Sequence, residues 1–328
     1  MTRQPDRYSL VADIGGTNTR VALAEGLDIV HGTVRRYRNA EYPGLETVLR
    51  EYLESEDDVD CAGACVAVAG PVRNGVGQLT NLDWRIDTDT LARATQAETV
   101  SILNDLQAQG FALEHLKPES LQTVIPMPDA VPDATRLVVG AGTGFNSATV
   151  YHTRKGRIVP PAEAGHANMP IRNEADLRLA KFVETAHGFP GIEDVLAGRG
   201  LERIYAWLGH EQGAVREVRA KEIMEALAEG SDPRAEETAR VYVRLLGSVV
   251  GNLALTMLPF GGIYLIGGVA TAFAPYLERF GFDDAFRDKG RFAGFMQNFG
   301  VSVVSDDYAA LVGCASHLCE VIEHEADF

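Results

Sequence analysis

The sequence has few cysteines, no long apolar segment and no recognisable leader. Its four cysteines form two close pairs, Cys61/Cys65 and Cys314/Cys319, and neither spacing matches a common zinc framework. We expect them to be small buried residues of a reducing cytoplasm. No apolar run approaches the roughly 18 residues of a membrane span, and the N-terminus lacks the apolar core of a signal peptide. The chain therefore predicts a cytoplasmic protein with no membrane partner.

Basic residues are also scarce. The chain has 30 Lys and Arg against 46 Asp and Glu, which gives a net charge of −16. Nucleic-acid-binding faces are basic, so we expect no nucleic-acid partner. A nucleotide remains possible, because a few backbone amides and one metal ion can hold it locally.

Two common nucleotide motifs are missing. The chain has no Gly-x-x-x-x-Gly-Lys-Ser/Thr loop. Gly140-x-Gly142 begins a dinucleotide fingerprint, but Phe145 occupies the position of the third glycine, and strand-like residues follow where a helix is needed. The sequence therefore argues against a Walker-type NTPase and a Rossmann dehydrogenase.

Strand and helix signals alternate along the chain. The first part predicts strands over 8–13, 19–24, 29–36, 61–69 and 99–103 and helices over 45–53 and 88–94. The later part predicts strands over 136–141, 263–266 and 301–304 and helices over 174–186, 201–208, 218–228, 233–258 and 308–320. This order predicts mixed sheets with helices packed on them.

The chain length of 328 residues exceeds the usual size of one core. We expect a small domain of residues 1–112 plus about 306–328 and a large domain of residues 113–305.

Two glycine turns are the most informative local feature. Asp13-Ile-Gly-Gly-Thr-Asn18 follows one apolar run, and Gly140-Ala-Gly-Thr-Gly144 follows another. Glycine lets backbone N–H groups approach a ligand closely, and successive N–H groups in such turns form anion-binding concavities. One such turn alone is typical of a hairpin. Two of them, in the two halves of one chain, indicate loops that close on one polyphosphate.

Two carboxylates lie where strands end. Asp13 can hold the hydration shell of a magnesium ion, or it can be a turn aspartate that bonds its own backbone. Asp105 follows Asn104 at the carboxyl end of a predicted strand, where ligand sites of α/β proteins gather. It can cap the next helix, or it can accept the proton of an attacking hydroxyl.

Further polar residues and glycines complete the candidate set. Glu163 and His166, three residues apart in a turn, can converge on neighbouring sugar hydroxyls, although a lone histidine is often structural. Glu193 by itself resembles first-turn helix charge. The glycine pairs 198/200 and 267/268 can shape a flat slot for a purine or simply form turns.

Taken together and in this order, the motifs resemble the bacterial ATP-dependent glucokinases of the sugar kinase/hexokinase/actin-like ATPase superfamily, over nearly the whole chain. The resemblance implies an α/β fold of two domains, the actin-like ATPase (ribonuclease H-like) fold, with mixed β-sheets, flanking helices and an interdomain active-site cleft. It implies ATP contacts from Asp13, Gly15, Gly16, Thr17, Asn18, Gly142, Thr143, Gly144, Gly267 and Gly268. It implies sugar contacts from Asn104, Asp105, Glu163, His166 and Glu193.

The reaction that the resemblance implies is transfer of the γ-phosphoryl group of MgATP to the 6-hydroxyl of glucose. Asp105 is then the general base, and Asp13 holds Mg²⁺ through water. The resemblance also implies a homodimer. Three alternatives stay open: a sugar-binding regulatory protein with little kinase activity, a kinase for another hexose, and a kinase that uses polyphosphate.

The chain departs from the family pattern at three places. Ala162 and Ala164 flank Glu163 where the family usually has glycines, Phe145-Asn146 replaces a common Leu-Gly, and Gln107 replaces a smaller residue. All lie near the expected sugar pocket, so they concern the identity of the hexose more than the reaction.

Overall fold

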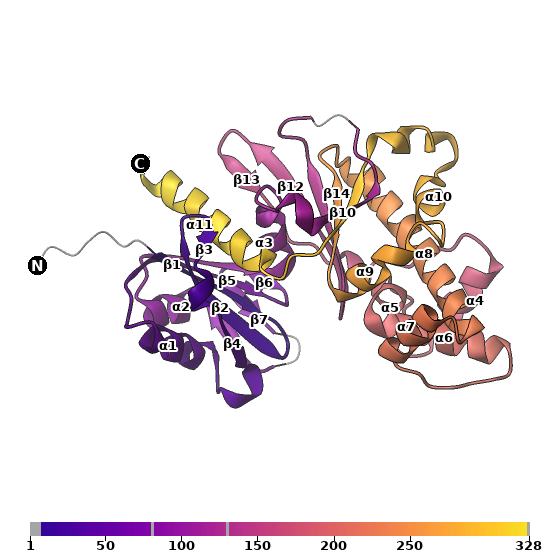
Figure 1. The fold of residues 1–328 in the computed structure, drawn as a ribbon, viewed down its shortest axis with the longest axis horizontal. Helices are drawn as coiled ribbons and strands as arrows, with labels where there is room; N and C mark the ends of the chain where they lie inside the picture. The colour runs from indigo at the N-terminus through magenta and orange to yellow at the C-terminus, as the bar shows by residue number, and fades with distance from the viewer. Residues whose placement is uncertain (1–7, 80–81, 129–130, 327–328) are drawn as a thin grey trace, which may run out of the picture. The chain divides into compact units, whose positions relative to one another are not determined.

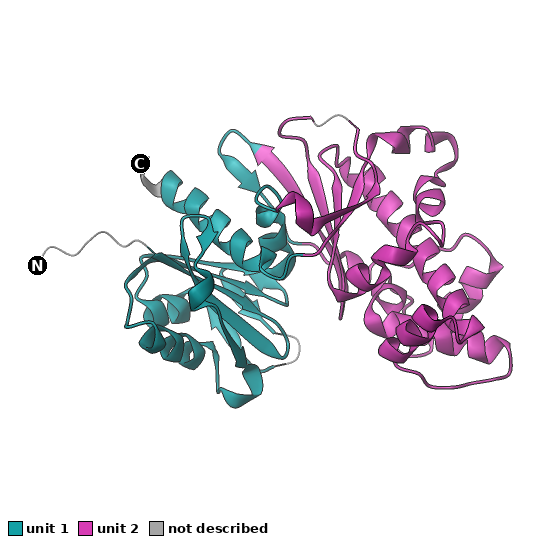
Figure 2. Ribbon diagram, in the orientation of Figure 1, with its two compact units in different colours: residues 1–116, 153–161, 306–328 teal, residues 117–152, 162–305 magenta. Residues whose placement is uncertain are grey.

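A computed structural model describes residues 8–79, 82–128 and 131–326 (Figure 1). The chain divides into two compact units (Figure 2). Unit 1 comprises residues 1–116, 153–161 and 306–328, and unit 2 comprises residues 117–152 and 162–305. Unlike the division expected from the sequence, this one gives residues 153–161 to the first unit. The domain limits stated above stay a prediction. The N-terminal residues used for the leader argument lie outside the described part.

Unit 1 is built on a mixed sheet of order β3-β2-β1-β5-β9, with β4 also pairing with β2. β1 is antiparallel to β2 and parallel to β5, and β5 is parallel to β9. The strands are β1 (Tyr8–Ile14), β2 (Asn18–Glu25), β3 (Asp28–Ile29), β4 (Arg35–Arg38), β5 (Cys61–Val68) and β9 (Thr99–Asn104). A smaller antiparallel sheet contains β6 (Val72–Arg73), β7 (Val76–Gln78) and β8 (Arg85–Asp87).

The central strands of unit 1 are apolar because helices cover them. Leu10, Ala12 and Ile14 of β1 belong to one core with residues of α1 (Leu45–Ser55) and α2 (Thr88–Thr95). Strand side chains alternate between the two faces. α11 (Ala309–Ala326) packs against β1, β5 and α3 (Asp105–Ala112). α3, the helix that Asp105 begins, therefore packs beside the C-terminal helix, and both helices contact the sheet.

A second mixed sheet has six strands in the order β10-β15-β14-β11-β12-β13. Unit 2 contains β10, β15, β14, β11 and nearly all of β12, whereas β13 lies in the residues assigned to unit 1. β11 is antiparallel to β12 and parallel to β14, and β14 is parallel to β15. The strands are β10 (Leu121–Ile125), β11 (Arg136–Ala141), β12 (Phe145–Thr153), β13 (Gly156–Ile158), β14 (Ile263–Ile266) and β15 (Val301–Val304).

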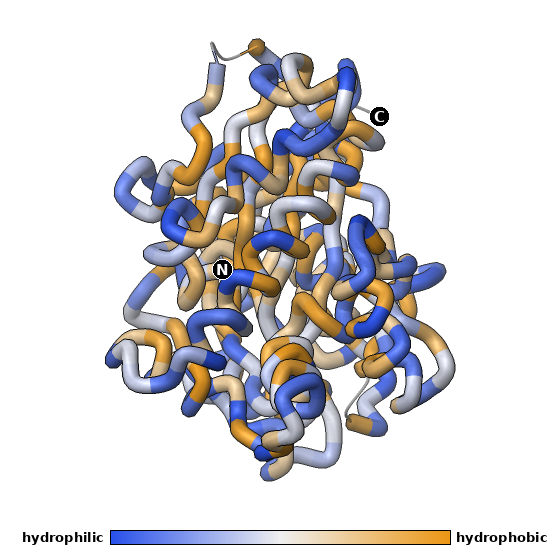
Figure 3. The backbone as a smooth tube through the Cα atoms, turned by 90° about the vertical axis from the view of Figure 1, so that its right-hand side faces the viewer, coloured by the Kyte–Doolittle hydropathy of each residue, from blue (hydrophilic) through white to orange (hydrophobic). Residues whose placement is uncertain are grey.

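Helices pack against this sheet, with α8 (Pro233–Met257) and α9 (Gly268–Phe273) in contact with its strands. α8 is the longest of them and contacts α6, α7, α10 and β11. Its Tyr242, Leu245 and Leu246 are fully buried. The other helices are α4 (Glu174–Glu184), α5 (Glu193–Leu196), α6 (Gly198–Glu211), α7 (Ala220–Glu229), α9 (Gly268–Phe273) and α10 (Phe282–Arg287). Figure 3 colours the chain by hydropathy and shows hydrophobic stretches alternating with hydrophilic ones, many of which are loops at the outside of the view.

The two units share one local topology. In each, a strand turns through glycines into an antiparallel partner while its other edge pairs with a parallel strand: β1 with β2 and β5, and β11 with β12 and β14. The two glycine turns therefore lie at the carboxyl ends of equivalent strands.

Some expected elements were wrong or missing. Residues 29–36 do not form one strand, because a 3-10 turn over His31–Thr33 separates β3 from β4. The Thr33 hydroxyl stabilises this break, donating to the Val30 carbonyl and accepting from the Leu23 amide. β10 was not among the strands expected from the sequence. As an edge strand it is partly exposed, so its sequence lacks a clear apolar run. Within the described residues, no helix is long and apolar enough to span a membrane.

The contact between α11 and α3 gives a test of the fold. Alanine normally stabilises a helix relative to glycine, but a Cβ on Gly313 would come within 1.7 Å of the Ala108 carbonyl oxygen. Gly313→Ala should therefore lower the free energy of unfolding by about 2 kcal/mol or more, measured by urea denaturation. Gly32→Ala is the matched control, because a Cβ there meets no atom within 4 Å. Equal stability of the two variants would contradict the α3–α11 packing.

Candidate active site

The first glycine turn joins β1 to β2, and the buried residue Asn39 stabilises it by hydrogen bonds. The Gly15 amide donates to the Asn18 carbonyl at 3.0 Å. The Asn39 side-chain amide donates to the Gly15 carbonyl at 2.7 Å, and the Asn39 backbone amide donates to the Thr17 carbonyl at 3.0 Å. Thr19 donates to the Asn39 side-chain oxygen at 2.8 Å. Gly16 and Thr17 remain exposed at the tip, so the turn presents a fixed backbone outward.

Asp13 lies at the end of β1, where it pairs with Arg20 of β2 and Ala67 of β5. Burial raises the pKa of its carboxyl above the ordinary value, and the Arg20 guanidinium offsets this effect in part. The carboxylate form is therefore costly in the protein alone, and a bound cation would stabilise it.

Asn104 and Asp105 lie at the carboxyl end of β9, and Asp13 lies at the carboxyl end of β1 in the same sheet, with β5 between these two parallel strands. Ile14 of β1 pairs with Val68 of β5, and Val68 in turn pairs with Asn104 of β9. The side-chain amide of Asn104 donates to the Gly70 carbonyl at 3.0 Å, and Gly70 lies just beyond the end of β5. The register thus brings the first turn and the Asn104-Asp105 pair to one rim.

The start of α3 is fixed by a capping box. The Asn104 side-chain oxygen accepts from the Leu106 amide at 3.0 Å, and the Gln107 side-chain oxygen accepts from the Asn104 amide at 2.9 Å. Gln107 also donates to the Val159 carbonyl at 2.6 Å. The alternative in which Asp105 caps this helix was wrong, because Asn104 is the N-cap and Asp105 is the first helical residue.

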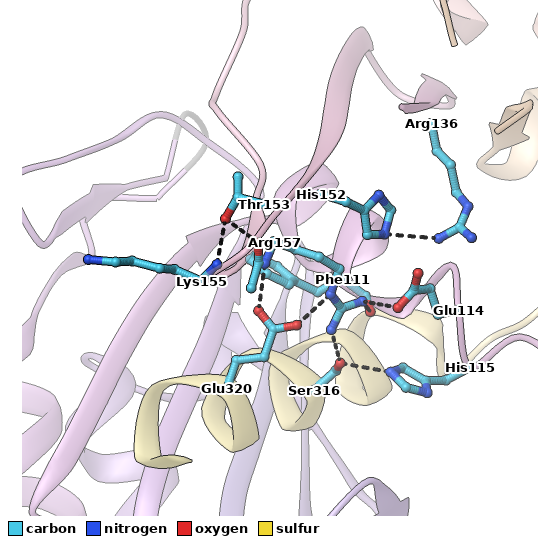
Figure 4. Close-up of polar contacts among 11 residues, drawn as sticks. Phe111, Glu114, His115, Arg136, His152, Thr153, Lys155, Arg157, Ser316 and Glu320 are labelled. Carbon is cyan, nitrogen blue, oxygen red and sulfur yellow. Dashed lines mark hydrogen bonds and ion pairs between the residues drawn. The ribbon is translucent and has the colours of Figure 1, made fainter. Parts of the chain in front are cut away.

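The far end of α3 is tied to α11 by Arg157, whose side chain is only 6% exposed (Figure 4). Its guanidinium binds the Glu320 carboxylate, donates to the Ser316 hydroxyl and donates to the Phe111 carbonyl of α3 at 2.8 Å. His115 also contacts Ser316, and burial, followed by the Arg157 charge, lowers the pKa of its imidazole. These contacts explain why residues 153–161 belong to unit 1.

The second glycine turn joins β11 to β12 in unit 2. The Gly142 amide donates to the Gly144 carbonyl, and the Gly198 amide donates to the Gly142 carbonyl, both at 2.9 Å. The Glu193 carboxylate accepts from the Phe145 amide at 2.9 Å. A Cβ on Gly144 would come within 2.7 Å of that carboxylate, so any larger residue here would force the Glu193 side chain to shift.

Glu163 and His166 lie in the exposed loop before and within a short 3-10 helix over Ala164–His166. The loop packs on the start of β12, because a Cβ on Gly165 would come within 2.0 Å of the Phe145 carbonyl. Asn146 contacts the loop on both sides of Glu163. Within unit 2 the structure therefore brings Glu163 and Glu193 to the same glycine turn.

An apolar pocket of about 410 Å³ adjoins this turn. It is lined by Gly198, Leu201, Met224, Gly268, Val269 and Phe273, among others. Gly267, just before α9, has φ +98°, and a Cβ there would come within 2.6 Å of the Ala141 carbonyl. Of the four glycines expected to shape a purine slot, Gly198 and Gly268 line this apolar cavity.

The structure gathers the candidate residues in two groups, one in each unit. Sequence reasoning missed Asn39 and the contacts of Asn146, because their partners lie far along the chain and carry no local motif. Among the described residues, no three His, Cys, Asp or Glu side chains are grouped to hold a metal ion.

Comparison with known proteins identifies the class. The crystal structure of a glucokinase from an Antarctic psychrotroph is 27% identical to this chain and superimposes with a TM-score of 0.85. The match covers 96% of this chain and 99% of the psychrotroph chain. A ROK family glucokinase from Streptomyces griseus, solved with glucose and AMPPNP, shares the fold at 20% identity and a TM-score of 0.60, over 95% and 98% of the two chains. The fold is that of the actin-like sugar kinases, as predicted.

The particular family follows from the sequence comparisons. The glucokinase family model matches residues 10–321. The glucokinase of Shigella sonnei is 32% identical over 324 residues, which is 97% of this chain and 99% of that protein. The chain belongs to the glucokinase family.

The raised pKa of Asp13 predicts a pH-dependent stability difference. In metal-free buffer the folded state holds the Asp13 proton more tightly than the unfolded state, so the free energy of unfolding loses a contribution as pH rises from 3.8 through the raised pKa. Asp13→Asn removes this loss. The variant should therefore gain stability relative to the natural protein as the pH rises above 3.8, measured by urea denaturation of both proteins over a series of pH values. A stability difference independent of pH would contradict the burial of this carboxyl.

Proposed function

We propose that this protein is a glucokinase that transfers the γ-phosphoryl group of ATP to the 6-hydroxyl of glucose. The observation that carries the proposal is the register of the unit 1 sheet, which puts Asp105 at the same rim as the Asp13–Asn18 turn. A proton acceptor and a phosphate-binding turn on one rim are what phosphoryl transfer to a hydroxyl requires. Membership of the glucokinase family supports glucose as the acceptor.

The phosphates are assigned to the two glycine turns. Backbone amides of Gly15, Gly16, Thr17 and Asn18 would bind them from unit 1, and those of Gly142, Thr143 and Gly144 from unit 2. The exposed tips at Gly16-Thr17 and Thr143-Gly144 support this assignment. The pocket beside Gly198 and Gly268 would take the adenine ring, because an aromatic base prefers an apolar slot, with Gly267 letting the backbone pass closely.

Asp105 is assigned as the general base. It would accept the proton of the sugar hydroxyl as that oxygen bonds to phosphorus. The Asn104 cap and the Gln107 bridge hold the first turn of α3, so the carboxylate needs little reorganisation during the reaction. Asn104, Glu163, His166 and Glu193 would bind the other sugar hydroxyls, and such contacts discriminate strongly against a sugar that lacks one.

Magnesium, held through water by Asp13, would neutralise charge on the phosphate oxygens. The buried position of the carboxyl and its raised pKa support this role. We further propose that the protein acts in the cytoplasm as a homodimer, as the resemblance to glucokinases implies.

A coupled ADP-release assay over several hexoses tests the proposed function. We expect turnover with glucose and ATP and a dependence on Mg²⁺. Sugar binding without turnover under varied metal conditions would instead indicate a sugar-binding regulatory protein. Preference for another hexose, or for polyphosphate over ATP, would correct the substrate while leaving the reaction class intact.

Asp105→Asn tests the base directly. Because the amide cannot accept the proton, kcat should fall by about 10²–10⁴-fold, while the glucose Kd, measured by calorimetry, should change little. Asp89→Asn is the matched control, since Asp89 is an exposed aspartate in the first turn of α2. Near-normal turnover of the Asp105 variant would eliminate this residue as the base.

Ala272→Trp tests the adenine pocket. Ala272 lines the cavity beside Gly268 and Val269, and the indole would occupy the space assigned to the base. The KM for ATP should rise about tenfold or more, which corresponds to about 1.4 kcal/mol of binding. The KM for glucose should stay unchanged. An unaltered KM for ATP would place the nucleotide elsewhere.

A further inference from the structure

The side chain of Asn146 makes an unusual set of contacts with the loop that carries Glu163. Its amide nitrogen donates to the Ala162 carbonyl at 2.5 Å and lies 3.5 Å from a Glu163 carboxylate oxygen. Its amide oxygen accepts from the Ala164 amide at 2.9 Å. One side chain therefore holds the backbone immediately before and after Glu163 and also faces its carboxylate.

The chemistry of these contacts requires a primary amide. The side chain must donate on one side and accept on the other, and among short side chains only asparagine does both in a fixed plane. The amide oxygen also accepts from the Ser147 amide at 2.8 Å, which fixes the orientation of the side chain on β12. The donor is consequently aimed at Ala162 and Glu163.

The loop also has a backbone hydrogen bond of its own, from the His166 amide to the Glu163 carbonyl at 3.1 Å. Glu163 itself is exposed, and an exposed carboxylate on a loop loses rotamer freedom when it binds a ligand. Gly165 anchors the following turn by its close approach to the Phe145 carbonyl. The residues on either side of Glu163 are alanines, whose backbone is more restricted than that of glycine. Asn146 and the two alanines together therefore restrict the loop.

We propose that Asn146 is a positioning residue that orients Glu163 and thereby sets sugar affinity and discrimination among hexoses. It acts through Glu163, whose carboxylate and flanking backbone it contacts. The inference rests on the proposed function, because it assigns Glu163 to the sugar.

Two substitutions separate the donor from the acceptor. Asn146→Ala removes both contacts with the loop. Asn146→Asp keeps the acceptor for the Ala164 amide but puts a carboxylate oxygen against the Ala162 carbonyl and the Glu163 carboxylate. We expect the glucose Kd and KM to rise about tenfold with alanine and further with aspartate, since a lost hydrogen bond to a charged group has about this effect. The kcat and the KM for ATP should change by less than about threefold.

A double-mutant cycle shows whether Asn146 acts through Glu163. In a Glu163→Ala background, Asn146→Ala should raise the glucose KM by less than about twofold, against about tenfold in the natural protein. The ratio of kcat/KM for glucose to that for its epimers should fall in the Asn146 variants. If Asn146→Ala does not fold, Asn146→Ser serves in the same cycle.

Asn298→Asp is the matched control, because this exposed asparagine donates to the Phe295 carbonyl outside the site and should leave all constants unchanged. Equal effects of Asn146→Ala with and without Glu163, or a loss of kcat without a change in KM, would overturn the inference alone. If the natural protein neither binds nor phosphorylates glucose, the proposed function fails and this inference fails with it.

Discussion

The close approach of backbone to backbone at the glycine turns is the constraint on which the site depends. In unit 2 the second turn must come close enough for the Gly198 amide to reach the Gly142 carbonyl and for the Glu193 carboxylate to reach the Phe145 amide. A side chain on Gly144 would displace that carboxylate. One hydrogen bond therefore joins the turn that we assign to the phosphates to a residue that we assign to the sugar.

In unit 1 the first glycine turn is likewise fixed by hydrogen bonds, but from a different kind of residue. The first turn is held by Asn39, a fully buried polar residue whose backbone and side chain both contact the turn. Buried polar groups are costly unless they are hydrogen-bonded, and here each bond also fixes the ligand-facing backbone. Asp13 shows the opposite balance, because its burial opposes ionisation. A charge of this kind is kept where a ligand or cation relieves the cost.

Much of the fold followed from the sequence for a physical reason. Long periodic segments such as α8 and continuous apolar strands such as β5 and β14 carry their structure locally. Short and edge elements did not, as the break at His31–Thr33 and the strand β10 show, because their structure depends on distant pairing. The candidate site residues show the same difference between what is local in the sequence and what depends on folding. Asp13, Asn104, Asp105 and Glu193 stand in recognisable motifs, whereas Asn39 and Asn146 acquire their roles only from partners brought near by folding.

The sequence by itself determined the residue types, the two glycine turns and their order along the chain, because turn conformation and ligand chemistry depend on local residues. Tertiary structure decided which carboxylates share a rim, which amide holds each turn and where the apolar pocket opens. These are properties of strand register and helix packing, which bring together residues far apart in the chain. Asn146 illustrates the difference: in the sequence it is a departure from a family pattern, and in the fold it holds both sides of Glu163.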